Sequence, residues 1–319
     1  MKRIILALVS LLVCQLAQAA PAQLATLQLG HGLTMNYYIS PAPAAPTGII
    51  IAVHGYKRDA NRTFDATQAA ASAAHQTSLV LVAPIFAVAA DESTKCQYAG
   101  VPAAQASNAV WRCPTWLDGD AAQNGAITSF SAMDALVAAL HKQFPTVRVI
   151  TVAGFSAGGQ FVQHYVGFAA PPPGGVKLRY VAADPGSWLY FDNYRPEPGS
   201  AICPGYNDWK LGLANLPPDL TRSPAAARAA YIKADVQYLE GALDDSSGPG
   251  TFYKLLAKKC GDELQGPYRL QRGQLYEAYD NKMLAKGAHH LTVVPGCAHD
   301  IACVFESPAA QAALFGGKS

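Results

Sequence analysis

The sequence lacks a long apolar run at its N-terminus, where a membrane anchor would start. The apolar stretch 4–13 spans ten residues, whereas a transmembrane helix needs about 20. It follows Lys2 and Arg3 and precedes Ala17-Gln18-Ala19, the small-x-small pattern of a signal peptidase site. We therefore predict a signal peptide over 1–19 and a secreted or periplasmic protein with no stable membrane span. Cys14 leaves a lipoprotein anchor as an alternative, although Val13 before it is bulkier than such processing prefers.

The sequence also lacks a block of basic residues. Loss of the predicted signal peptide removes Lys2 and Arg3 and leaves 22 basic and 22 acidic residues. A formally neutral chain gives no reason to expect a nucleic acid or an anionic membrane surface as partner. There is no internal repeat either, and residues 20–319 are enough for one large α/β domain. Nothing in the sequence indicates the oligomeric state.

The spacings typical of a zinc site, Cys-x-x-Cys or paired Cys and His, are absent. Six cysteines remain after the predicted cleavage, and an even number in an exported protein favours disulfides. Connectivity cannot be read from sequence alone. Our expectation is the three bonds Cys96–Cys113, Cys203–Cys260 and Cys297–Cys303, of which the first and last would close short loops.

What the sequence does contain is a series of apolar, β-branched runs that alternate with helix-like stretches. This pattern predicts a mostly parallel sheet with helices on both faces. The predicted strands are 48–54, 78–83, 147–154, 178–183, 236–240 and 291–295, with an antiparallel hairpin over 27–40 at one edge. The predicted helices are 129–144, 157–168, 225–233 and 251–259. Residues 186–228, rich in Trp, Tyr and Pro, form a long insertion where a lid or substrate wall would lie.

The pentapeptide Gly154-Phe155-Ser156-Ala157-Gly158 is the first motif that carries chemistry. A buried-strand run precedes it and helix-compatible sequence follows, which is the context of a nucleophilic serine on a sharp strand-to-helix turn. The two glycines relieve crowding at that turn. The same turn would direct the N–H of Ala157 toward a developing oxyanion. The alternative is a glycine-rich turn with an incidental serine.

A second apolar strand ends in His54-Gly55-Tyr56. This arrangement matches a loop that supplies the other oxyanion donor, here the N–H of Tyr56. We interpret His54 as a structural residue that braces the loop by hydrogen bonds.

A serine hydroxyl needs a histidine base and an orienting carboxylate. Asp244 follows a predicted strand and is our choice for the acid, while Asp245 and Asp184 stay open as alternatives. Asp245 could instead cap a following helix. His299 follows the last predicted strand and is the expected base, whereas His289 and His290 precede that strand and should lie at the opposite edge of the sheet.

The order Ser156, Asp244, His299, with His54-Gly55 upstream, resembles the α/β-hydrolase superfamily. Within it, the signal peptide, nearby Arg58 and Asn61, and the Ser-Ala-Gly-Gly elbow resemble the exported polyhydroxybutyrate depolymerase and feruloyl esterase-like group. The resemblance covers nearly the whole predicted mature chain. It implies the α/β-hydrolase fold and a two-step acyl-enzyme mechanism on carboxylic esters.

The resulting prediction is an exported serine esterase that acts on a small or polymeric ester and needs no metal or organic cofactor. A serine peptidase or amidase with the same triad is one alternative, and a non-catalytic binding module on the same fold is another. Four aromatic residues could line an apolar acyl or aryl pocket, or could simply pack under the long insertion. These are Trp111, Trp116, Trp188 and Tyr190.

Overall fold

The computed structural model describes residues 21–199 and 202–317, so the predicted signal peptide lies outside the described residues. Eight strands form one sheet in the order β1-β2-β4-β3-β5-β6-β7-β8. Strands β3 to β8 run parallel, while β2 pairs antiparallel with β4 and β1 antiparallel with β2. The bounds are β1 Gln23–Gly30, β2 Leu33–Ile39, β3 Gly48–Val53, β4 Leu79–Pro84, β5 Val149–Phe155, β6 Lys177–Ala183, β7 Asp235–Gly241 and β8 His290–Val294. This is the mostly parallel sheet with an edge hairpin that the sequence predicts.

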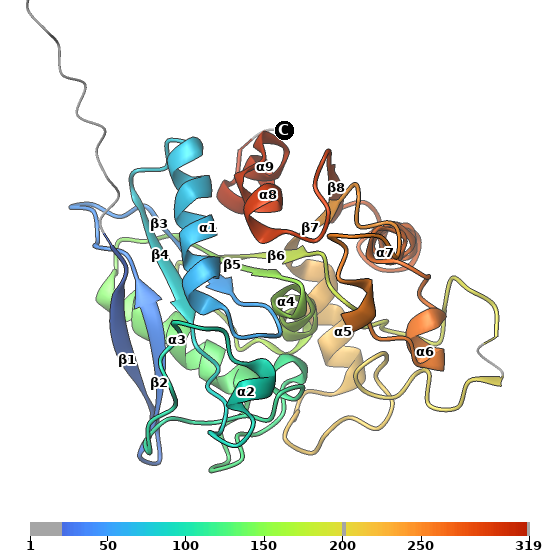
Figure 1. Ribbon diagram of the computed structural model, residues 1–319, viewed down its shortest axis with the longest axis horizontal. Coiled ribbons are helices and arrows are strands. Elements are labelled where there is room, and N and C mark those ends of the chain that lie inside the picture. Colours follow the sequence, from blue (N-terminus) through green and yellow to red (C-terminus); the bar gives the residue numbers. More distant parts are fainter. Residues whose placement is uncertain (1–20, 200–201, 318–319) are drawn as a thin grey trace, which may run out of the picture.

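Helices cover both faces of the sheet (Figure 1). On one face lie α1 Ala60–Ala73, α8 Ile301–Glu306 and α9 Gln311–Phe315; on the other lie α3 Ser129–Gln143, α4 Ala157–Phe168, α5 Pro224–Lys233 and α7 Arg269–Met283. Shorter helices are α2 Ser93–Cys96, α6 Cys260–Glu263 and the 3₁₀ turns η1 Trp116–Asp118, η3 Tyr253–Leu255 and η4 Pro308–Ala310. Because side chains alternate along a strand, Ile49 and Ile51 of β3 enter one core and Ile50 the other.

The predicted helix over 251–259 is wrong. Only the single 3₁₀ turn η3 forms there, because Phe252 has a left-handed backbone with φ 47° and Leu256 is extended. The irregular backbone lets the preceding residues serve the site, since Gly250 O accepts the N–H of His299 and Thr251 O accepts Arg269.

The sequence patterns missed α1 and α7. The buried side of α1 is mostly small alanines and threonines, which give a weak periodic signal. Helix α7 buries the charged residues Arg269, Arg272 and Asp280, which an apolar-stripe criterion counts as exposed.

Three disulfides join Cys96 to Cys113, Cys203 to Cys260 and Cys297 to Cys303, the pairs expected from the sequence. Such bonds fit an oxidising compartment outside the cytosol. None of the helices in 21–199 and 202–317 is both long and apolar enough to cross a bilayer.

The aromatic residues considered for a substrate pocket are core residues. Trp111, Trp116, Trp188 and Tyr190 are completely buried. Trp188 and Tyr190, at the start of the insertion 186–228, pack on Tyr276 of α7. The idea that these four rings line an open pocket is therefore wrong, and the role of the insertion as a lid or substrate wall stays a prediction.

Candidate active site

Ser156 lies on the sharp turn between β5 and α4. Its backbone has φ 59° and ψ −121°, a conformation that costs a non-glycine residue free energy and that tight packing must maintain. A Cβ atom on Gly154 would overlap the carbonyl of Gly158, and one on Gly158 would overlap the carbonyl of Val53 in β3. Glycine at both positions lets the turn approach the neighbouring strand closely enough to raise the serine above the sheet edge.

The structure brings the three residues of the predicted triad together. His299 Nε2 lies 2.8 Å from Ser156 Oγ, and His299 Nδ1 lies 2.7 Å from Asp244 Oδ2. Asp244 and His299 are buried, whereas Ser156 is partly exposed. The three side chains follow β5, β7 and β8, whose carboxyl ends meet at the same edge of a parallel sheet. The hydrogen-bonded chain is the geometry by which a histidine can take the serine proton.

The two alternative acids have other positions. Asp245 is exposed, and no helix begins directly after it within the described residues, so the expected capping role is wrong. Asp184 is buried at the end of β6, and its Oδ1 accepts the N–H of Gly241 at 2.9 Å. Asp184, Asp244 and His299 each place a possible metal-ligating atom within 4.8 Å of the others, but His299 Nδ1 is already hydrogen-bonded to Asp244.

Arg269, the first residue of α7, is a member of the site that the sequence patterns did not reveal. Its Nη1 lies 3.4 Å from Asp244 Oδ1 and donates to Thr251 O at 2.6 Å. The same helix end donates the N–H of Leu270 to the carbonyl of Asp244. Burial and the Arg269 guanidinium together lower the pKa of His299 to about 4, although the hydrogen bond to Asp244 acts in the opposite direction. A neutral imidazole, the form that can accept a proton, is thereby favoured.

The loop after β3 lies beside Ser156. A Cβ atom on Gly55 would be 3.9 Å from the Cβ of Ser156. The expected oxyanion donors are the N–H of Tyr56, in this loop, and the N–H of Ala157, the first residue of α4. His54 is buried and braces the loop, since its Nε2 accepts the N–H of Phe86 and its Nδ1 bonds Gly55 O. Burial lowers the pKa of His54 to about 3, which fits a neutral structural residue.

Arg58, noted with the family resemblance, is a buried tie for this loop. It donates to the carbonyls of Phe86, Trp111 and Arg112 and to the sulfur of Cys96. Asn61 donates to the carbonyl of Ala99. Both residues therefore fix the surroundings of the loop after β3, and neither side chain contacts the triad through any of these bonds.

Exposed apolar side chains occur in the loops at the sheet edge that carries Ser156 and His299. The ring of Phe252 lies 6.0 Å from the ring of His299, and Phe252, Leu243 and Leu255 are each more than half exposed. Tyr56 is also exposed. These residues come from the loops that follow β3 and β7, so the apolar surface belongs to the same sheet edge as the triad.

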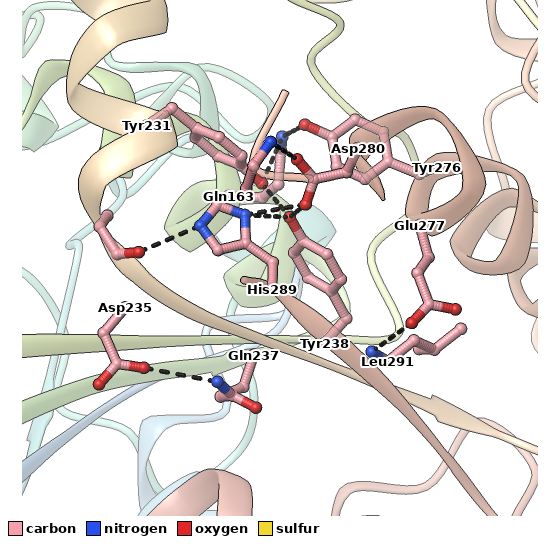
Figure 2. Close-up of polar contacts among 12 residues, drawn as sticks. Gln163, Tyr231, Asp235, Gln237, Tyr238, Tyr276, Glu277, Asp280, His289 and Leu291 are labelled. Atoms are coloured by element: carbon pink, nitrogen blue, oxygen red, sulfur yellow. Dashed lines mark hydrogen bonds and ion pairs between the residues drawn. The ribbon is translucent and has the colours of Figure 1, made fainter. Parts of the chain in front are cut away.

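A second histidine–carboxylate pair lies at the start of β8, before the strand rather than after it (Figure 2). His289 Nδ1 is 2.8 Å from Asp280 Oδ2, and its Nε2 is 3.0 Å from Ala234 O. Tyr238 OH bonds the same carboxylate and contacts Tyr231, so the pair is enclosed by buried tyrosines. No serine contacts it among the bonds of the described residues. The expectation that His289 lies away from the triad is confirmed.

Comparisons with known proteins agree on the fold. No protein-family model matches the chain, and no curated protein matches it in sequence. The chain is similar in structure to poly(aspartic acid) hydrolase-1 from Sphingomonas sp. KT-1, with 20% identity, coverage of 88% of this chain and 94% of that chain, and a TM-score of 0.61. It is also similar to a poly(3-hydroxybutyrate) depolymerase from Bordetella parapertussis, with 19% identity, coverage of 91% and 89%, and a TM-score of 0.61.

The protein therefore has the α/β-hydrolase fold, as the sequence resemblance implies. At 19% identity the similarity to a poly(3-hydroxybutyrate) depolymerase shows the fold alone, so the depolymerase part of the group named from the sequence stays a prediction. The feruloyl esterase-like part of that resemblance stays a prediction.

Proposed function

We propose that this protein is an exported serine hydrolase that cleaves carboxylic esters through an acyl-enzyme on Ser156. The observation that carries the proposal is the hydrogen-bonded chain from Ser156 Oγ through His299 to Asp244, with distances of 2.8 and 2.7 Å. Export is supported by the predicted signal peptide and by the three disulfides.

In the proposed mechanism, His299 Nε2 takes the proton of Ser156 as Oγ attacks the ester carbonyl. The N–H groups of Tyr56 and Ala157 donate to the oxyanion of the tetrahedral intermediate. Asp244 holds the imidazolium, which then gives its proton to the leaving alcohol. Water, deprotonated by the same imidazole, hydrolyses the acyl-enzyme and regenerates the serine.

The substrate class is argued from the surface around the site. We take Phe252, Leu243, Leu255 and Tyr56, exposed apolar residues of the chain segments after β3 and β7, as an apolar rim of the proposed site. Such a surface favours an ester with an apolar acyl or aryl group, including a polyester chain lying across the rim. The similarity to a polyester depolymerase supports this choice.

Amide hydrolysis is the second candidate, because the other similar structure is a poly(aspartic acid) hydrolase and poly(aspartic acid) is a polyamide. A panel of activated esters of increasing acyl length, measured against peptide amides, separates the two. We expect the ratio of kcat/KM values to favour esters with apolar acyl groups. A preference for amides would move the assignment to an amidase.

Labelling with a fluorophosphonate probe tests the nucleophile directly. The wild-type protein should be labelled, and Ser156→Ala should not. Asp244→Asn should lower kcat by about 10⁴, by analogy with other triad aspartates, whereas the control Asp245→Asn should leave kcat nearly unchanged because Asp245 is exposed. Labelling that persists in Ser156→Ala would remove Ser156 as the nucleophile, and a complete lack of labelling in the wild type would favour a non-catalytic module.

A further inference from the structure

Two buried carboxyl groups, Asp184 and Glu240, lie behind the triad and have no part in the proposed chemistry. Ala183 of β6 is in register with Leu239 of β7, so the next residues along, Asp184 and Glu240, are neighbours at the carboxyl ends of these strands. Both side chains are completely buried and lie within hydrogen-bonding reach of each other. In the described part of the chain, no N–H or O–H group donates to Asp184 Oδ2 or to either carboxyl oxygen of Glu240.

Helix α7 closes the space over Glu240. Gly273 lies in the interior of that helix, and a Cβ atom there would be 2.6 Å from Glu240 Cγ. Glycine inside a helix is less favourable than alanine, so its presence at position 273 fits a need for close contact. Two facing buried carboxylates without a donor would be strongly unfavourable, whereas one proton shared between them satisfies both.

The charged groups around the pair compensate for it only in part, since the Arg269 guanidinium lowers the pKa of both carboxyl groups but burial outweighs it. Arg269 directs its Nη1 to Asp244 and Thr251, and the nitrogens of Arg272 donate to the backbone carbonyls of Gly266, Gly186 and Ala257. From the neighbouring loops, Asp244 adds a further negative charge, and His299 is kept neutral by its burial. Accordingly, burial, and after it the neighbouring acids, raise the pKa of Glu240 well above its usual value and that of Asp184 to about 7.

The pair is connected to the triad through one residue, Gly241. Asp184 Oδ1 accepts the N–H of Gly241, and Gly241 O accepts the N–H of Asp244 at 3.0 Å. A Cβ atom on Gly241 would lie 2.7 Å from the carbonyl oxygens of both Cys297 and Ala298, so the loop that carries His299 rests on the same residue. A shift of Gly241 would therefore displace both the acid and the base.

We propose that Glu240 carries a proton in the folded protein and donates it in a hydrogen bond to Asp184, and that this acid pair positions the turn that presents Asp244 to His299. Asp184 is then a positioning residue that accepts from Glu240 on one oxygen and from Gly241 on the other. The positioning role rests on the proposed function, whereas the shared proton does not.

The variant Glu240→Gln tests the proton, because an amide can still donate to Asp184 but cannot ionise. The pKa of Glu240 is higher in the folded protein than in the unfolded chain, where it is about 4.5. The contribution of this carboxyl group to stability is therefore complete below about pH 4.5 and is lost as the pH rises, because the unfolded chain then releases the proton first. We therefore expect the unfolding equilibrium constant of the wild type to increase relative to that of Glu240→Gln by up to about tenfold per pH unit above that value. The exposed Glu306→Gln is the matched control and should follow the wild type. Parallel curves for the wild type and Glu240→Gln would overturn the proposal.

Infrared spectroscopy covers the case in which Glu240→Gln does not fold. Wild-type protein labelled with ¹³C in the glutamate carboxyl groups should show an isotope-shifted band of a protonated acid at neutral pH. A spectrum without that band overturns the shared proton.

Kinetics test the positioning role. Asp184→Ala removes the acceptor for Gly241 and should lower kcat at least tenfold with little change in KM, while Asp184→Asn should restore most of kcat because its amide oxygen can accept the same N–H. Equal kcat values for Asp184→Ala and the wild type overturn the role. Failure of the proposed function is seen separately, as a lack of fluorophosphonate labelling in the wild type, and would leave the stability result unaffected.

Discussion

The acid limb of the pH–activity profile should lie near pH 4 and should depend on Arg269. Hydrolysis needs neutral His299, and burial together with Arg269 lowers the pKa of this imidazole from 6.5 to about 4. At about 1.4 kcal/mol per pKa unit, the site favours the neutral form by ~3 kcal/mol relative to an exposed histidine. Activity should therefore be retained at pH 5, where an unperturbed histidine is mostly protonated and inactive.

Replacing Arg269 by Gln removes the cation 3.4 Å from Asp244 and should move the acid limb upward, toward 6.5. Because burial is the larger cause, the limb should move only part of the way. The assay is kcat/KM for an activated ester from about pH 3 to about pH 9, which reports the free enzyme. Arg112→Gln, at an exposed arginine, is the control.

Two results would refute this reasoning. A wild-type midpoint near 6.5 contradicts the effect of burial on His299. A midpoint that does not move in Arg269→Gln contradicts the electrostatic role of the guanidinium. A uniform loss of kcat at every pH would then point to the hydrogen bond from Arg269 to Thr251 O as its contribution.

Two further changes test the geometry of the site. Gly158→Ala should lower kcat by about 10² and the free energy of unfolding by ~1–3 kcal/mol, because the added methyl group meets the carbonyls of Val53 and His54. Ester kinetics measure the first effect and circular dichroism melts the second. Gly174→Ala is the control, because a Cβ atom there has no neighbour within 4 Å. If the alanine variant matches the wild type, close packing at the elbow is not required. The double variant Cys297→Ser, Cys303→Ser opens the short loop around His299. It should lower the free energy of unfolding by ~2 kcal/mol in urea titrations and lower kcat in ester assays. An unchanged kcat would mean that the remaining contacts hold the histidine.

Much of the site follows from local sequence. Ser156 is recognisable because a strand, two glycines and a helix are consecutive in the chain, and His299 because it follows the last strand. The parallel order of the strands then brings His299 to the same sheet edge as Asp244 and Ser156, which precede it in the sequence by 55 and 143 positions. The pattern also separates His299 from His289, since a residue before a strand and a residue after it lie at opposite edges.

The sequence by itself determined the strand series, the edge hairpin, the strand–turn–helix around Ser156 and the order of the proposed triad residues, because each depends on the spacing of apolar residues and on the turn residues between them. Only the tertiary structure shows that Asp244, and neither Asp245 nor Asp184, is hydrogen-bonded to His299, since three acids that follow strands look alike until their distances to His299 are known. It also decided that Trp111, Trp116, Trp188 and Tyr190 are core residues, and that Arg269 and Glu240 lie beside the triad. The physical reason is the same in each case: burial and charge pairing depend on which residues of α7 and the neighbouring strands pack together, and that information is not local in the chain.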